Sequence, residues 1–177
     1  LGLAGDRESK SRLVERTTDE RAEVRAAAIW AMHRLGDTSR TSMLAGLLLD
    51  DPSASARRLT AQLLGRLGEP NAAALLKRAM RDKDQGVRME AVAAMARLGD
   101  MHAAQKLVYS ANSGFADEQT FAMLELAMIA SPRFEELFRY RLDEGPYMET
   151  RLVAARGLGR LGRSEEHTSE LQSPNTI

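Results

Sequence analysis

Few side chains in this sequence have the type and spacing that catalysis or metal binding requires. His33 and His102 are the only histidines before residue 163, they fall at different positions of the repeat described below, and the chain has no cysteine. A metal site needs several ligands that converge. The run from Gly157 to Gly162 spells Gly-x-Gly-x-x-Gly, but it falls at the end of an expected helix and not after a strand, so it does not indicate a dinucleotide site. The sequence therefore predicts no catalytic, cofactor-binding or metal-binding residues.

A short motif, Arg-Leu-Gly, recurs along the chain. Its glycines are Gly36, Gly68, Gly99 and Gly162, at separations of 32, 31 and 63 residues, and Ala130 stands where the missing copy should end. A period of about 31–32 residues is typical of helical repeat arrays. We therefore divide the chain into the end of a truncated repeat (residues 1–5), five repeats (6–36, 37–68, 69–99, 100–130 and 131–162, the fourth degenerate) and a tail (163–177).

Each repeat is expected to contain two antiparallel helices. Residues one, four, five, eight and twelve positions before the glycine lie on one side of a helix, so the second helix of each repeat should end at that glycine. Glycine is the expected C-cap because it adopts the left-handed conformation without a Cβ penalty. Apolar-periodic stretches between the motifs predict the first helices at Thr38–Leu49, Asn71–Met80, Met101–Ser110 and Arg133–Leu142. The sequence thus predicts an all-α fold.

The residues Val24-Arg25-Ala26-Ala27-Ala28-Ile29, followed by Arg34-Leu35-Gly36-Asp37, have a second copy from Val87-Arg88 to Gly99-Asp100. This pattern resembles bacterial HEAT repeats of the kind also called lyase-like HEAT repeats, and the resemblance covers Leu1 to Gly162. It implies a right-handed α-solenoid in which the first helices form the convex face and the second helices the concave face.

One arginine stands eleven residues before the end of most repeats. The resemblance implies a structural ladder, in which an arginine at the start of each second helix bonds acidic or backbone acceptors of the turns, with a ligand-binding ladder as the alternative. Asp19, Asp51 and Asp82 stand six residues before these arginines, in turns where an acid can cap the helix. In the fourth repeat Gln119 replaces the arginine, which leaves its ladder contact open. The ladder residues are Arg25, Arg57, Arg88 and Arg151.

Second-helix positions outside the core stripe line the concave surface in the family. Here they carry six arginines, one glutamate and the only tryptophan. Apolar side chains interleaved with arginine are typical of the centre of a protein interface. The alternative is that arginines in the last turn complement the helix dipole while Phe121, Leu124 and Met128 pack against neighbours. The residues expected to bind a partner are Trp30, Arg34, Arg58, Arg66, Met89, Arg97, Phe121, Leu124, Arg156 and Arg160.

We therefore expect a non-catalytic protein–protein interaction scaffold or regulatory module that binds an acidic-plus-apolar segment of another protein on the concave face. The alternative is an accessory domain of an enzyme, such as a bilin lyase or a chaperone-like HEAT protein. Binding to a nucleic-acid backbone is less favoured, because 25 basic residues balance 25 acidic ones, whereas phosphate binding usually brings a strongly basic footprint. The full-length parent could carry a separate catalytic domain.

The two ends of the chain do not look like natural ends. The sequence starts at Leu1 without an initiator methionine. Residues 163–173 resemble a translated sequencing adapter, so we expect 163–177 to be a non-native, disordered tail and the chain to be a metagenomic fragment. The longest uncharged apolar run, Met43–Leu49, is too short to span a membrane. Absence of cysteine fits both cytoplasm and periplasm, with the cytoplasm slightly favoured.

Overall fold

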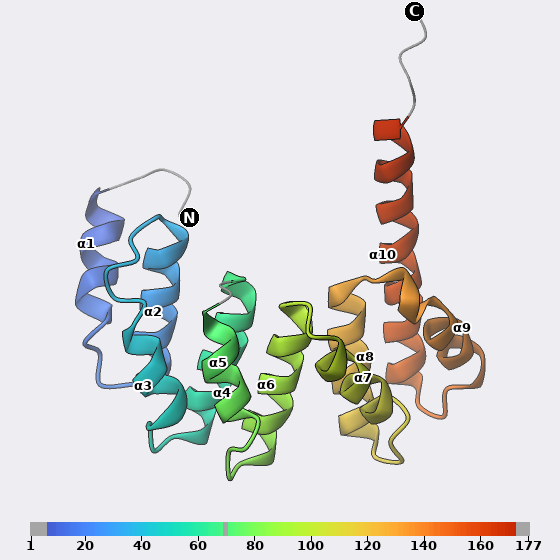
Figure 1. The fold of residues 1–177 in the computed structure, drawn as a ribbon, viewed down its shortest axis with the longest axis horizontal. Coiled ribbons are helices and arrows are strands. Elements are labelled where there is room, and N and C mark those ends of the chain that lie inside the picture. Colours follow the sequence, from blue (N-terminus) through green and yellow to red (C-terminus); the bar gives the residue numbers. More distant parts are fainter. Residues whose placement is uncertain (1–6, 69–70, 173–177) are drawn as a thin grey trace, which may run out of the picture. The chain divides into compact units, whose positions relative to one another are not determined.

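The regular structure is helical throughout the part of the chain that the structure describes (Figure 1). The computed structural model describes the backbone of residues 7–68 and 71–172 and the side chains of residues 9–68 and 71–162. The expected truncated repeat at residues 1–5, Pro70 and the last five residues lie outside this range. The all-α fold predicted from the sequence is confirmed, and no helix in the described part is long and apolar enough to cross a membrane.

The chain divides into two compact units, residues 1–103 and 104–177. In the first unit α2 packs against α1 and α4, and α4 packs in turn against α6. The helices of this unit are α1 (Arg7–Arg16), α2 (Ala22–Arg34), α3 (Met43–Leu49), α4 (Ala54–Leu67), α5 (Ala72–Ala79) and α6 (Gln85–Arg97). The even-numbered helices are the second helices of their repeats, as the glycine spacing predicted.

In the second unit α10 packs against both α8 and α9. Helix α7 (Met101–Ser110) spans the boundary between the units in sequence. It is followed by α8 (Ala116–Ile129), the short 3₁₀ helix η1 (Pro132–Phe134), α9 (Glu135–Glu144) and α10 (Met148–Gln172). Here α8 and α10 are the second helices, and they lie side by side (Figure 1).

The second helices end at the predicted residue in four repeats, and the last one continues past it. Gly36, Gly68 and Gly99 have φ values of 85°, 71° and 91°, so the predicted left-handed glycine caps are confirmed. Ala130 adopts the same conformation, with φ 51° and ψ 43°, although it carries a Cβ. By contrast, α10 continues past Gly162 to Gln172.

The helix end predicted at Gly162 is therefore wrong, and the tail is helical up to Gln172 where disorder was expected. The physical reason is that residues 163–172 include glutamates and leucine and contain neither glycine nor proline, so nothing in this stretch stops a helix. The adapter origin of residues 163–173 stays a prediction.

Two first helices differ from their predicted bounds. Helix α3 begins at Met43 and not at Thr38, because Asp37 Oδ1 accepts a hydrogen bond from the Ser39 N–H and holds the chain in a turn. In the last repeat Pro132 starts η1, which leads directly into α9. The other two predicted first helices, Asn71–Met80 and Met101–Ser110, correspond closely to α5 and α7.

Small residues let neighbouring helices approach closely in both units. A Cβ added to Gly65 in α4 would lie 2.7 Å from Cα and Cβ of Ala94 in α6. In the second unit a Cβ added to Gly157 in α10 would lie 2.9 Å from the Phe138 ring of α9. Both distances are shorter than van der Waals contact allows. Close packing of helices on helices thus fixes the direction in which each second helix presents its remaining face.

Candidate partner-binding surface

Each of the first three second helices is preceded by a turn built around an aspartate. Oδ1 of Asp19, Asp51 and Asp82 accepts the backbone N–H of the residue two positions later, at 3.0, 2.9 and 2.8 Å respectively. These are Asx turns, which form because a carboxylate can satisfy an N–H that the coming helix leaves unpaired. The N–H of Arg21 lowers the pKa of Asp19, so this carboxylate stays ionised at neutral pH.

Arg57 joins two consecutive turns and is the most deeply buried arginine of the ladder. Its Nη1 donates to the carbonyl oxygens of Asp51 and Pro52 at 2.7 and 3.2 Å, within its own repeat. Its Nε and Nη2 donate to both carboxylate oxygens of Asp82, in the next repeat, at 2.8 and 2.9 Å. The Arg57 side chain is only 3% exposed. A bidentate pair of this kind fixes distance and orientation together.

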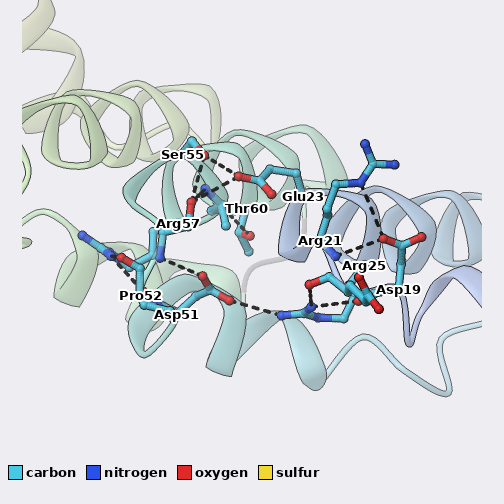
Figure 2. A network of polar contacts seen from close by, with 12 residues as sticks. Asp19, Arg21, Glu23, Arg25, Asp51, Pro52, Ser55, Arg57 and Thr60 are labelled. Carbon is cyan, nitrogen blue, oxygen red and sulfur yellow. Dashed lines mark hydrogen bonds and ion pairs between the residues drawn. The ribbon is translucent and has the colours of Figure 1, made fainter.

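Arg25 repeats this arrangement one repeat earlier with weaker geometry. It donates to the carbonyl oxygens of Asp19 and Glu20, each at 2.9 Å, and reaches Asp51 of the next repeat at 3.3 Å (Figure 2). Arg88 makes the bonds within its own repeat, to the carbonyl oxygens of Asp82 and Lys83. These arginines are therefore occupied by turn backbone and aspartates.

The fourth and fifth repeats make the link without an arginine–aspartate pair. Gln119 Nε2 donates to the carbonyl of Ser113, six residues earlier, at 3.0 Å, as the arginines do in their own repeats. Its Oε1 accepts the hydroxyl of Thr150, at the start of α10, at 3.0 Å. Gly145 stands where the first three repeats have the aspartate, and a Cβ there would collide with the Arg141 carbonyl oxygen. Arg151 donates to the Leu142 carbonyl oxygen at 3.0 Å.

A second polar link joins the first two repeats. Glu23 in α2 accepts hydrogen bonds from the hydroxyls of Ser53 and Ser55 at the start of α4 (Figure 2). The Ser55 hydroxyl is the main cause of a lowered pKa at Glu23. Residues that sequence reasoning missed in these links are Glu23, Ser53, Ser55 and Thr150, because they stand outside the repeated columns.

Because the ladder side chains are bonded within the turns, the candidate binding surface consists of the outward positions of the second helices. Trp30 and Arg34 of α2 line a groove of about 390 Å³, the α1–α2 groove. The guanidinium of Arg34 lies 5.9 Å from the centre of the Trp30 ring, within range of a cation–π contact. The remaining lining residues are Ser9, Arg12, Leu13, Arg16, Ala31 and Leu35. The α1 residues were not predicted from the sequence, because the repeated columns lie on the second helices.

The predicted residues of α4 and α6 differ in how far they are exposed. Arg58 and Arg66 are exposed, and Met89 is half-buried. Arg97 has a side chain only 9% exposed, and its Nη2 lies 3.1 Å from Oε1 of Glu90, which is itself 5% exposed. The single glutamate among the predicted surface positions is thus buried against an arginine. Arg97 is held inside the unit by this ion pair.

The predicted residues of the last two repeats come together in a second groove. Leu124 of α8 lies opposite Arg156 and Arg160 of α10, and the groove has a volume of about 570 Å³. Ala127, Met128, Val153 and Gly159 complete this α8–α10 groove. Phe121 is half-buried and does not line it. No acidic residue is among the described residues that line either groove.

Metal-ligating residues do not cluster in the described ranges. Within residues 9–68 and 71–162, no group of three or more His, Cys, Asp and Glu side chains is placed to hold a metal ion. His33 makes a 2.9 Å hydrogen bond to the Thr41 hydroxyl, and His102 lies exposed on α7.

Known structures show the same fold. The complex of CpcE and CpcF of phycocyanin lyase from Nostoc sp. PCC7120 includes a chain that is 20% identical, with a TM-score of 0.55 over 97% of this chain and 71% of that one. An engineered protein is 18% identical, with a TM-score of 0.51 over 96% of this chain and 91% of that one. At these identities the likeness concerns the fold alone.

Sequence comparison gives the family. No curated protein sequence matches the chain significantly. The family model for HEAT repeats matches residues 1–58 and 41–123, which together are more than half of the chain. This match agrees with the glycine-capped helix pairs and with the arginine–aspartate turns of the first unit. The chain therefore belongs to the HEAT-repeat family.

Proposed function

We propose that this HEAT-repeat chain is a non-catalytic interaction module that binds a partner protein on the exposed face of its second helices, the concave face expected for such a solenoid. The observation that supports this most is the composition of the two grooves. Each combines arginine with large apolar side chains, and no acidic residue is among the described residues that line them. Arginine and large apolar side chains provide most of the binding energy at protein interfaces.

The ladder arginines do not belong to this surface. Arg25, Arg57 and Arg88 are occupied within the turns, and Arg151 donates to a backbone carbonyl. Arg97 is withdrawn by Glu90. The proposed binding residues are of two kinds. Arg58 and Arg66 lie exposed on α4, and the others line the two grooves, namely Trp30, Arg34, Leu124, Met128, Arg156 and Arg160.

A display experiment tests this function while the partner is still unidentified. The full chain is immobilised and challenged with a phage library of random peptides, and enrichment of peptides that combine acidic and apolar residues is expected. A variant with Arg34→Glu, Arg66→Glu and Arg156→Glu should lose these peptides. Enrichment that the triple variant leaves unchanged would contradict the proposal.

A matched control places the same change of charge on first helices and a turn. Lys77, Lys106 and Arg81 are all exposed and lie outside both grooves. The variant with Lys77→Glu, Arg81→Glu and Lys106→Glu should retain the selected peptides. Loss of capture in both variants would indicate a general effect of net charge and would count against a specific surface.

The second candidate is a role as an accessory subunit of a lyase-type assembly. Its support is the fold shared with a chain of the CpcE–CpcF complex over 97% of this chain. The test is to add a free bilin to the full chain and record its absorbance spectrum. A shifted spectrum that the triple arginine variant abolishes would favour this candidate over peptide binding.

A further inference from the structure

The two walls of the α8–α10 groove differ in chemistry but have the same four-residue spacing. Leu124 and Met128 lie four residues apart on α8, and Arg156 and Arg160 lie four residues apart on α10. Leu124 and Arg156 occupy equivalent repeat positions, and so do Met128 and Arg160. Residues four apart on a helix are separated by about 6 Å along its axis and point in similar directions. The groove therefore sets two apolar side chains opposite two cations at matching heights.

The N-terminal ends of these helices are held together, which keeps the two walls aligned. The hydroxyl of Tyr147, directly before α10, donates to the carbonyl of Gly114, two residues before α8, at 3.0 Å. Thr150 and Gln119 make the second link, one turn further in. Two fixed contacts at one end of a helix pair define the relative register of the side chains along it.

The two cations are available for a ligand. Neither Arg156 nor Arg160 makes an ion pair with a residue whose side chain the structure describes. In the α1–α2 groove, by contrast, Arg16 is paired with Asp19 at 3.3 Å. The apolar wall is also accessible, since Leu124 is 40% and Met128 42% exposed. Ala127 and Val153 are buried and form the floor between the walls.

We propose that the α8–α10 groove binds an amphipathic helix of a partner protein, one that carries two acidic residues one turn apart beside two large apolar residues. The acids would pair with Arg156 and Arg160, and the apolar residues would cover Leu124 and Met128. This inference rests on the proposed function and names the site and the kind of segment that it takes.

The lining of the groove favours a helix over an extended peptide. The backbone groups of α8 and α10 are used within these helices, so the groove offers an extended chain no carbonyl or N–H partners. An extended segment would leave its backbone unpaired above Leu124 and Met128, which is costly, whereas a helix satisfies its own backbone. Single-stranded nucleic acid is disfavoured because no aromatic ring lines the groove for a base to stack on.

The first experiment compares one peptide in two forms. A dye-labelled peptide with glutamates at i and i+4 and leucines at i+3 and i+7 is made both linear and side-chain stapled as a helix, and its binding to the full chain is measured by fluorescence anisotropy. Stapling should tighten binding about tenfold, because the linear form must first fold. Weaker binding of the stapled form would overturn the helical occupant.

The second experiment fills the groove without removing any charge. A Cβ added to Gly159 meets nothing within 4 Å, so Gly159→Met should project into the groove without disturbing the fold. Methionine is also a better helix former than glycine, so the melting temperature should be unchanged or higher. Binding of the stapled peptide should fall about tenfold or more. Unchanged binding would place the peptide elsewhere and overturn the proposal.

The chain offers a matched control for this substitution. Gly46 in α3 also lies in a helix with nothing within 4 Å of an added Cβ, and it is far in sequence from the groove. Gly46→Met should leave binding of the stapled peptide unchanged. Equal loss of binding in both glycine variants would show that added apolar surface, and not occupation of the groove, is responsible.

The third experiment exchanges the charges. Arg156→Glu with Arg160→Glu should weaken binding of the glutamate peptide about tenfold or more, and a peptide with lysines in place of the glutamates should restore it on this variant. Failure of the lysine peptide to recover binding would overturn the direct pairing. Tighter binding of a single-stranded oligonucleotide than of the stapled peptide would overturn it in favour of nucleic acid.

The outcomes separate this inference from the proposed function. Peptides selected by display that bind the Gly159→Met variant as well as the parent chain, yet are lost from the triple arginine variant, would leave the interaction module intact and place its site outside the α8–α10 groove. Absence of any selected peptide would count against the proposed function itself.

Discussion

Arg57 in α4 and Gln119 in α8 occupy the same position in their repeats, and both bond the carbonyl six residues earlier. They differ in how they reach the next repeat. Arg57 does so through a bidentate ion pair with Asp82, whereas Gln119 accepts a single hydroxyl hydrogen bond from Thr150. The bond within the repeat is thus kept while the bond between repeats changes from ionic to neutral.

This difference has a steric cause. Gly145 occupies the aspartate position of the last repeat, and a side chain there would collide with the carbonyl of Arg141. An arginine at position 119 would face no carboxylate from that turn. Glutamine, which offers both a donor and an acceptor, can use the turn carbonyl and the Thr150 hydroxyl at once. The two units therefore join repeats by links that should respond differently to mutation and to pH.

The largest expected effect is loss of the charged link. Asp82→Ala leaves the buried guanidinium of Arg57 without its carboxylate and should lower the free energy of unfolding by about 3 kcal/mol, since an unpaired buried charge is strongly destabilising. Hydrogen exchange of peptides from the first unit reports this loss separately from the second unit. The paired change Arg57→Met with Asp82→Leu should recover most of the stability, and no recovery would contradict the pairwise account.

The second-largest expected effect is a difference between the two units in how their stability depends on pH. The pKa of Asp82 lies below its ordinary value of 3.8. The main cause is the hydrogen bond from the Arg57 side chain, and the Asp84 N–H lowers this pKa further. A lowered folded pKa means that the carboxylate stabilises the first unit above that ordinary value and that this contribution is lost as the pH falls through the folded pKa. The parent chain and the Asp82→Asn variant should differ in their free energy of unfolding, and this difference should shrink as the pH falls below about 4. A gap independent of pH would show that ionisation of Asp82 is not involved.

The structure of the first unit was easier to predict from the sequence than that of the second, because the repeated motifs are complete only in the first unit. Where Arg-Leu-Gly and the aspartate column recur, spacing alone located the helix ends at Gly36, Gly68 and Gly99. In the fourth repeat the columns fail, yet Ala130 still caps α8, which packs against α10, in the left-handed conformation. The repeated columns do not include Thr150, which replaces the missing aspartate from a different position.

The candidate surface shows the same limit. The periodicity identified the outward positions of the second helices, and most of them are accessible. It could not foresee that Arg97 is taken up by Glu90, because that pair depends on how α6 rotates against Gly65 of α4. Nor could it foresee that α1 lines the first groove, since its side chains carry no repeated motif.

A smaller effect is expected from loss of the neutral link in the second unit. Thr150→Val keeps the shape of the side chain but removes the hydroxyl that bonds Gln119 Oε1, and should lower stability by about 1–2 kcal/mol. The loss should not vary between neutral and acid pH, since no ionisable group takes part. Thr150→Ser retains the hydroxyl and is the control. A loss that grows on acidification would mean that a carboxylate takes part in this link after all.

The smallest expected effect concerns the caps of α4 and α8, where the two units solve one problem with different residues. Gly68 and Ala130 both hold a left-handed conformation, which costs a residue with a Cβ about 1–2 kcal/mol. Ala130→Gly should therefore raise the stability of the second unit by about 1 kcal/mol, and Gly68→Ala should lower that of the first by a similar amount. Nothing lies within 4 Å of a Cβ added at Gly68, so the loss there would report backbone strain alone. If Ala130→Gly instead destabilised the second unit, the methyl group of Ala130 would have to contribute packing that outweighs its backbone strain, and the cap of the fourth repeat would be held by contacts rather than by conformational preference.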